Sequence, residues 1–230
     1  METDTFVRAL KSHQMTVHCL EVLRTGELVS GSLDRTIKVW DYQNGECLKT
    51  LRGHIGAIFC LDFFSTGELV SAGDNSIKIW DLENEYCIQS LEGHQFWVMC
   101  VRVMATGELV SCSLDRTIKI WDPKNNRCKR TLLGHTNGVS WIELLFIDKI
   151  ASASWDKTIK IWNLNDFSCI QTLFGHSKLI FCLKFLPSGA LLSASDDRKI
   201  KIWDLVENRC LKTLEPHQHS ISQIELFKQI

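Results

Sequence analysis

Two apolar patterns alternate along the chain and recur at a fixed spacing. Runs of almost continuous apolar residues, such as MTVHCLEVL from Met15 and GAIFCLDFF from Gly56, suit strands that are covered on both faces. Runs such as TIKVW from Thr36 alternate apolar and polar residues, which is typical of a strand with one buried face. Pairs such as Thr25-Gly26 separate the runs, and glycine there supplies the positive φ of a tight turn. The pattern therefore predicts an all-β chain.

A repeat unit of about 41 residues organises these runs. The stretch ELVSGSLDRTIKVWD at residues 27–41 returns four more times in closely similar form. Its tryptophans are spaced by 40 or 41 residues and are Trp40, Trp80, Trp121, Trp162 and Trp203. A second set of markers keeps step with them and consists of His13, His54, His94, His135, His176 and His217. Each unit also contains a Cys-bearing run, such as CLKTL from Cys47, so it holds four predicted strands, enough for one antiparallel blade.

The Gly-His start and the Trp-Asp end of these units resemble the WD-repeat family, and the resemblance covers essentially the whole chain. It implies an all-β propeller of four-stranded antiparallel blades, with five complete blades, an N-terminal outer strand at residues 6–10 and a C-terminal inner strand at residues 221–227. We expect a single domain over residues 1–230, with repeats near 13–53, 54–93, 94–134, 135–175 and 176–216 and a partial unit at 217–230. A shorter likeness, GHQFWVMCVRV from Gly93, is to lissencephaly-type dynein regulators.

The number of units leaves two interpretations open. The strands expected at residues 6–10 and 221–227 belong to a blade whose middle strands are missing from the sequence. Either the chain is a fragment or truncated product of a six- or seven-bladed protein, or its ring is incomplete. An incomplete ring would have open blade edges, which are able to pair with another chain and so to support self-association.

Composition and charge narrow the class of partner. The chain has 230 residues, of which 45% are apolar and 23% charged, as expected for one sizeable core. Its 26 basic and 27 acidic residues nearly cancel and form no basic run, which disfavours nucleic acid and anionic membranes as partners. No signal peptide or membrane-length apolar run is present, so we expect an intracellular protein, cytoplasmic or nuclear. Nine of the ten cysteines fall at two repeat positions, and we interpret them as buried thiols.

Each unit repeats a His, a Ser, an Asp and a Trp. The family resemblance implies that these form a structural hydrogen-bonded network, in which the Asp orients the His and the Ser links the His to the indole; a buried indole needs such a partner. The expected members are His13, Ser30, Asp34, Trp40, His54, Ser71, Asp74, Trp80, His94, Ser111, Asp115, Trp121, His135, Ser152, Asp156, Trp162, His176, Ser193, Asp197 and Trp203. A nucleophilic or metal site would occur once rather than five times. We therefore expect no enzymatic activity, no cofactor and no metal.

Residues that differ between the units are the better candidates for binding. The family resemblance implies that the turn before each Asp and the loop after each His lie on a rim that binds partners. The expected contact residues are Met15, Leu33, Ile55, Phe96, Trp97, Leu114, Trp155 and Leu179. Exposed Leu33, Leu114 and Trp155 would form an apolar surface, which soluble proteins seldom leave without a use. The sequence thus predicts a non-catalytic scaffold for a peptide or protein partner. Two alternatives stay open, a central-channel ligand sensor or propeller enzyme and a fragment without independent function.

Overall fold

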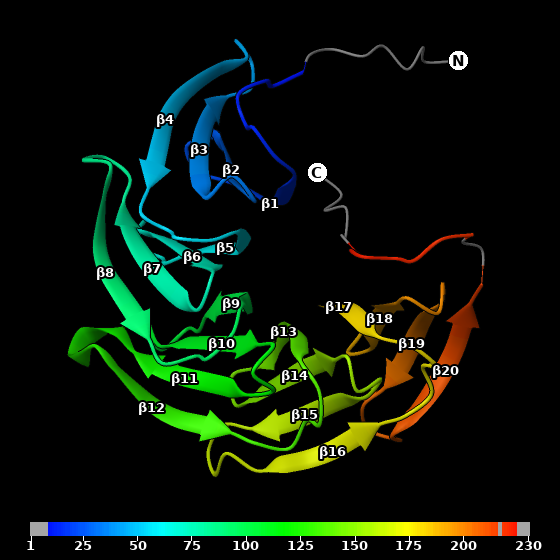
Figure 1. The fold of residues 1–230 in the computed structure, drawn as a ribbon. Helices are drawn as coiled ribbons and strands as arrows, with labels where there is room; N and C mark the ends of the chain where they lie inside the picture. The colour runs from blue at the N-terminus through cyan, green and yellow to red at the C-terminus, as the bar shows by residue number, and fades with distance from the viewer. Residues whose placement is uncertain (1–8, 216–217, 225–230) are drawn as a thin grey trace.

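The computed structural model describes residues 9–215 and 218–224 and consists of five separate four-stranded antiparallel sheets. The sheets follow one another around a common centre and form an open ring (Figure 1). In the described part of the chain the only helical element is the short 3-10 turn η1 (Pro123–Asn125) between β11 and β12. The predicted all-β propeller blades are therefore confirmed.

Each sheet is one blade, and within it the strands follow in chain order from the centre of the ring outward (Figure 1). Blade 1 contains β1 (Val17–Val22), β2 (Leu28–Ser32), β3 (Thr36–Asp41) and β4 (Glu46–Arg52). Blade 2 contains β5 (Ile58–Phe63), β6 (Leu69–Gly73), β7 (Ser76–Asp81) and β8 (Tyr86–Glu92). Blade 3 contains β9 (Val98–Val103), β10 (Leu109–Ser113), β11 (Ile118–Asp122) and β12 (Arg127–Leu132). Blade 4 contains β13 (Val139–Phe146), β14 (Lys149–Ser154), β15 (Ile159–Asn163) and β16 (Cys169–Leu173). Blade 5 contains β17 (Ile180–Phe185), β18 (Leu191–Ser195), β19 (Ile200–Asp204) and β20 (Arg209–Leu214).

The sequence of each strand matches its depth in the blade. In blade 3, every residue of β10 is buried, and its small Ser and Cys side chains let the neighbouring sheets approach closely. Strand β11 alternates, with Ile118 and Ile120 buried and Lys119 partly exposed. The Lys119 ammonium donates to the Thr131 hydroxyl on the outer strand at 2.9 Å, which occupies the polar face of this strand pair.

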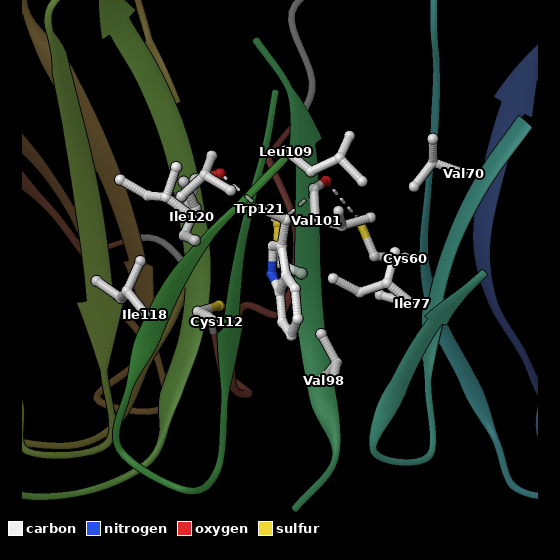
Figure 2. Close-up of a cluster of buried hydrophobic side chains, with 14 of the residues drawn as sticks. Cys60, Val70, Ile77, Val98, Val101, Leu109, Cys112, Ile118, Ile120 and Trp121 are labelled. Atoms are coloured by element: carbon white, nitrogen blue, oxygen red, sulfur yellow. Dashed lines mark hydrogen bonds between the residues drawn. The ribbon is translucent and has the colours of Figure 1, made fainter. Parts of the chain in front are cut away.

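The apolar core lies between neighbouring blades rather than within one sheet. Figure 2 shows the interface of blades 2 and 3, where Val70 and Ile77 of blade 2 face Val101, Leu109 and Trp121 of blade 3. Trp121 is 1% exposed, and its counterparts Trp80 and Trp203 hold the same position between blades 1 and 2 and between blades 4 and 5. In blades 2 to 5, one tryptophan per blade thus packs the blade against the preceding one.

The glycine of the Gly-His pair is required by this packing. Gly93 has φ +148°, and a β-carbon there would lie 3.3 Å from Cη2 of Trp121, which is tighter than ordinary contact. The chain therefore crosses from the outer strand of one blade to the inner strand of the next directly over the tryptophan ring.

The inner strand of blade 1, at one end of the open ring, is more exposed than the inner strands of the interior blades. On β1, Val17 and Leu20 are 41% and 56% exposed, whereas the equivalent Ile58 and Leu61 of blade 2 are 0% and 1% exposed. Within the described residues, no further sheet packs on this face of blade 1.

The terminal strands expected from the sequence are only partly within the described residues. Residues 6–8 and 225–227 lie outside them, as does His217, while residues 9–10 and 221–224 have no strand structure. Residues 218–224 instead pass the end of β18, where the Ile221 N–H donates to the Ser195 carbonyl at 3.3 Å. In the described residues this stretch forms no sheet.

The interpretation of the repeated cysteines as buried thiols is wrong for the outer strands. Cys60, Cys100 and Cys182 are buried, but the outer-strand position is exposed at Cys47, Cys128, Cys169 and Cys210. The outer strand is the edge of each blade, so only the inner position is covered. All ten cysteines are free thiols.

Candidate functional site: the loop rim and the central channel

Each blade fastens its rim loop with the same chain of hydrogen bonds. In blade 3, His94 lies in the loop before β9, with its Nδ1 2.7 Å from Oδ2 of Asp115 and its Nε2 2.8 Å from Oγ of Ser111. The indole Nε1 of Trp121 donates to the same Ser111 oxygen at 2.8 Å. The equivalent bonds of the other blades join His13, Asp34, Ser30 and Trp40; His54, Asp74, Ser71 and Trp80; His135, Asp156, Ser152 and Trp162; and His176, Asp197, Ser193 and Trp203.

The protonation states of the network follow from burial. Burial penalises the imidazolium and lowers the pKa of His94, which the hydrogen bond and charge of Asp115 offset only in part. Burial alone would raise the pKa of the Asp115 carboxyl, but hydrogen bonds from His94 and Thr117 outweigh it and hold the pKa far below its usual range. A neutral histidine therefore sits beside a carboxylate. The indole donates to the serine, the serine hydroxyl to Nε2, and Nδ1–H to the carboxylate.

The Ser, His and Asp side chains are hydrogen-bonded in the same order as in a catalytic triad. The serine oxygen, however, is not accessible to a substrate. Ser111 is 0% exposed, and its oxygen already accepts the indole N–H of Trp121. A substrate has no path to this oxygen, and the same holds for the buried serines of the other blades. The arrangement instead fixes the rim loop against the body of the blade, because Asp115 also accepts from the Gln95 N–H at 3.0 Å.

Four of the sequence-predicted contact residues are exposed on one half of the rim. Met15, Ile55, Phe96 and Trp97 are 58%, 77%, 63% and 54% exposed. They lie in the loops that lead into β1, β5 and β9, and we call them the apolar rim. The corresponding loops of blades 4 and 5 carry polar residues instead, Thr136, Asn137, Ser177 and Lys178.

The other four predicted contact residues, Leu33, Leu114, Trp155 and Leu179, are half-buried. The expectation of an exposed surface made by Leu33, Leu114 and Trp155 is therefore wrong. The turn before each Asp packs against the loop after a His, since the Leu114 N–H donates to the Trp97 carbonyl at 3.1 Å and the Trp155 N–H to the Gly138 carbonyl at 2.8 Å. The Leu114 side chain closes on Gly138, where a β-carbon would lie only 2.7 Å from Leu114 Cδ2.

A cavity of about 590 Å³ occupies the centre of the ring. Aromatic residues of the inner strands and of one turn line it, including His18, Phe59, Trp141, Trp155 and Phe181. The ring centroids of His18 and Phe59 are 5.2 Å apart, within aromatic contact distance. The β1 register shifts between Val17 and Cys19, and His18, at this shift, lies beside the cavity.

Charged residues of both signs occupy one repeat position of the inner strands, and all of them except Glu143 line the cavity; the sequence analysis missed them. They are Glu21, Asp62, Arg102, Glu143 and Lys184, and aligning the inner-strand runs would have found them. Asp62 accepts from the Val103 N–H at 2.8 Å, and Glu143 accepts from the Phe185 N–H at 3.0 Å. The two carboxylates therefore accept hydrogen bonds from backbone N–H groups at the edge of the next blade's inner strand, so these charged side chains have a structural role.

No group of three or more His, Cys, Asp or Glu side chains is arranged to hold a metal ion in the part of the chain that the structure describes. Within residues 9–215 and 218–224, no helix has the length and apolarity needed to cross a membrane.

Comparison with known proteins agrees with the geometry of the blades. A family model described as WD domain, G-beta repeat (WD40) matches five consecutive stretches, residues 4–41, 45–81, 85–122, 126–163 and 167–204. A stretch of 45 residues is 44% identical to Coatomer subunit beta'-2 of Arabidopsis thaliana and covers 18% of this chain and 5% of that protein. The chain therefore spans only a small part of that relative's length. Because the family model accounts for most of the sequence, the chain belongs to the WD40 family of WD-domain, G-beta repeat proteins.

Proposed function

We propose that this chain is a protein-interaction scaffold that binds a peptide or protein partner on its loop rim. The observation that carries the proposal is the apolar rim, in which Met15, Ile55, Phe96 and Trp97 are each more than half exposed on neighbouring blades. Clustered exposed apolar and aromatic side chains are typical of interaction sites, and aromatic residues are enriched among interface anchors. The half-buried Leu33, Leu114, Trp155 and Leu179 belong to the proposal as side chains at the edges of that surface.

The rigidity of the loops supports the same proposal. The loop that carries Phe96 and Trp97 is held by the bond from His94 to Asp115 and by the backbone bond from Leu114 to the Trp97 carbonyl. A surface fixed before binding loses little conformational entropy when a partner docks. The same hydrogen-bonded network holds the rim loop in every blade. This repetition favours binding of a partner over catalysis as the function of the rim.

The proposal also covers the compartment, self-association and the class of partner. Ten free cysteines favour a reducing, intracellular compartment, cytoplasmic or nuclear. The exposed Val17 and Leu20 on blade 1 are compatible with self-association through an open blade edge. The near-neutral net charge of −1 favours protein over nucleic acid as the partner class.

The experiment compares two faces of the molecule. A rim variant, Ile55→Ser with Phe96→Ser, removes two exposed apolar side chains of the apolar rim. A matched control, Ile147→Ser with Val206→Ser, removes two apolar side chains that are 85% and 91% exposed near the opposite ends of the strands. Proteins captured from a cell extract by each tagged variant are quantified by mass spectrometry.

We expect the partners of the wild-type protein to be lost by the rim variant and retained by the control. Exposed substitutions of this kind change stability by about 0.5 kcal/mol or less, so both variants should fold, which circular dichroism checks. Equal capture by all three proteins, or loss by the control alone, would place the binding surface elsewhere.

A further inference from the structure

Blade 1 has an apolar face on the side away from blade 2, where the ring is open (Figure 1). Val17 and Leu20 on this face are 41% and 56% exposed, although both are large apolar residues. In each of the other four blades the residues at these two positions are no more than 1% exposed. Apolar positions that are buried in four repeats and exposed in the fifth indicate a surface that a partner covers.

A groove of about 610 Å³ runs over this face. Val17 and Leu20 of β1, Leu28 of β2 and Trp40 of β3 line it, so the groove spans three strands of the blade. Met15 also lines it and is the one member of the apolar rim that does so. The groove is therefore a second surface, beyond the rim to which the proposed function refers.

The interface of blades 1 and 2 shows what covers the equivalent face of an interior blade. The blade 2 residues at the positions of the groove lining are Ile58, Leu61, Leu69 and Trp80. They share a buried cluster with four residues of blade 1, namely Val29 of β2, Ile37 and Val39 of β3, and Leu51 of β4. Three of these four covering residues are β-branched and come from the hairpin formed by β2 and β3.

The outer-strand position beside the groove is already occupied. Leu10 stands three residues before His13, as Leu51 stands three residues before His54, and Leu10 lines the groove. A complete four-stranded blade, such as blade 5 of a second copy, would bring its own outer strand to the same place. The uncovered part of the interface therefore corresponds to the two middle strands alone.

We propose that this groove binds a β-hairpin of a partner protein, which packs face to face on β1 and β2. The hairpin would present β-branched apolar residues to Val17 and Leu20, as Val29, Ile37 and Val39 do to blade 2. Its two strands satisfy each other's backbone hydrogen bonds, while an isolated hairpin lacks an apolar surface on which to pack. The exposed face of blade 1 supplies that surface.

The test uses a cyclised peptide that contains residues 27–41, because this β2–β3 segment covers the equivalent face of blade 2. Its hairpin structure is first checked by NMR, and its binding to the intact 230-residue chain is measured by fluorescence anisotropy. Leu20→Asp places a charge in the groove. Leu211→Asp is the matched control, because Leu211 lies on the outer strand β20 and is 48% exposed. A peptide with Ile37→Asp tests the apolar face without any change to the protein.

We expect one peptide to bind per chain of the wild type. Leu20→Asp should weaken binding by about ten- to a hundredfold, since it removes apolar contact and buries a charge. Leu211→Asp should leave the affinity unchanged, and the Ile37→Asp peptide should lose affinity for the wild type by a similar factor. Both protein substitutions are at exposed sites and should preserve the fold, which circular dichroism checks.

Three results would overturn the proposal. They are the absence of binding to the wild type, equal weakening by Leu20→Asp and Leu211→Asp, and a wild-type dimer in ultracentrifugation that Leu20→Asp dissociates. The last result would show that a second copy covers the groove.

The rim variant Ile55→Ser with Phe96→Ser separates this proposal from the proposed function. It should bind the hairpin peptide as tightly as the wild type does, whatever its capture of rim partners. If the rim variant loses the peptide and Leu20→Asp keeps it, the peptide binds the rim, so the hairpin site is wrong while the rim proposal stands.

Discussion

The substitution Ser111→Ala tests whether the repeated network holds the blades together. The Ser111 hydroxyl is fully buried and lies 2.8 Å from both the indole nitrogen of Trp121 and Nε2 of His94. Alanine removes one oxygen and leaves the backbone and the packing of β10 nearly unchanged. Two buried polar groups then lose the partner they share.

The expected cost follows from those two groups. A buried donor or acceptor that loses its partner costs about 1–3 kcal/mol. Two such groups give a loss of at least about 2 kcal/mol in the free energy of unfolding. For a chain of 230 residues, about 2 kcal/mol lowers the melting temperature by about 4–8 °C.

The assay is thermal unfolding followed by circular dichroism, together with urea unfolding. The control is Ser177→Ala, which removes an exposed hydroxyl from the loop after His176 and should change stability by about 0.5 kcal/mol or less. If Ser111→Ala melts within about 1 °C of the wild type, as the control should, then the network does not hold the blades and the reasoning fails.

Two further predictions come from the same blade. The pKa values of His94 and Asp115 are both lower in the folded protein than in the unfolded chain, so the unfolded chain binds more protons as the pH falls. The free energy of unfolding should therefore decrease below about pH 6.5 through the histidine and below about pH 4 through the carboxylate, and Asp115→Asn should flatten the lower part of a urea-midpoint profile; a profile flat from pH 7 to pH 3 would contradict this. Gly93→Ala should destabilise more than Gly107→Ala in urea unfolding. Both glycines have positive φ, but only the Gly93 β-carbon would press on Trp121, and equal losses would exclude that contact.

Much of the fold could be predicted because the repeat imposes it. The recurrence of Trp121 and its counterparts sets the blade length, and the alternation in TIKIW sets which face of β11 is buried. Exposure within the turns was not predictable from residue type. Leu114 looks like an exposed anchor in the sequence, but it folds onto Gly138 of the next loop, a contact that depends on how adjacent blades pack.

The channel was missed for a related reason. Most residues that line it come from five inner strands separated by about 41 positions, and no local motif marks them. The signal that exists is the charged residue at one repeat position of every inner strand, for example Asp62, Arg102 and Glu143, and it appears only when the inner strands are aligned. The buried state of Trp155 Nε1 could not be read from sequence at all, since it depends on the absence of an acceptor within reach in three dimensions.

Site-specific photo-crosslinking tests the rim proposal most directly. A photoreactive phenylalanine analogue replaces Phe96 on the apolar rim in one variant and Ile147, 85% exposed, in another. After irradiation in cells, we predict that Phe96 gives a covalent adduct with a partner protein and that Ile147 gives none. An adduct at Ile147 with none at Phe96 would contradict the claim that this rim is the binding surface.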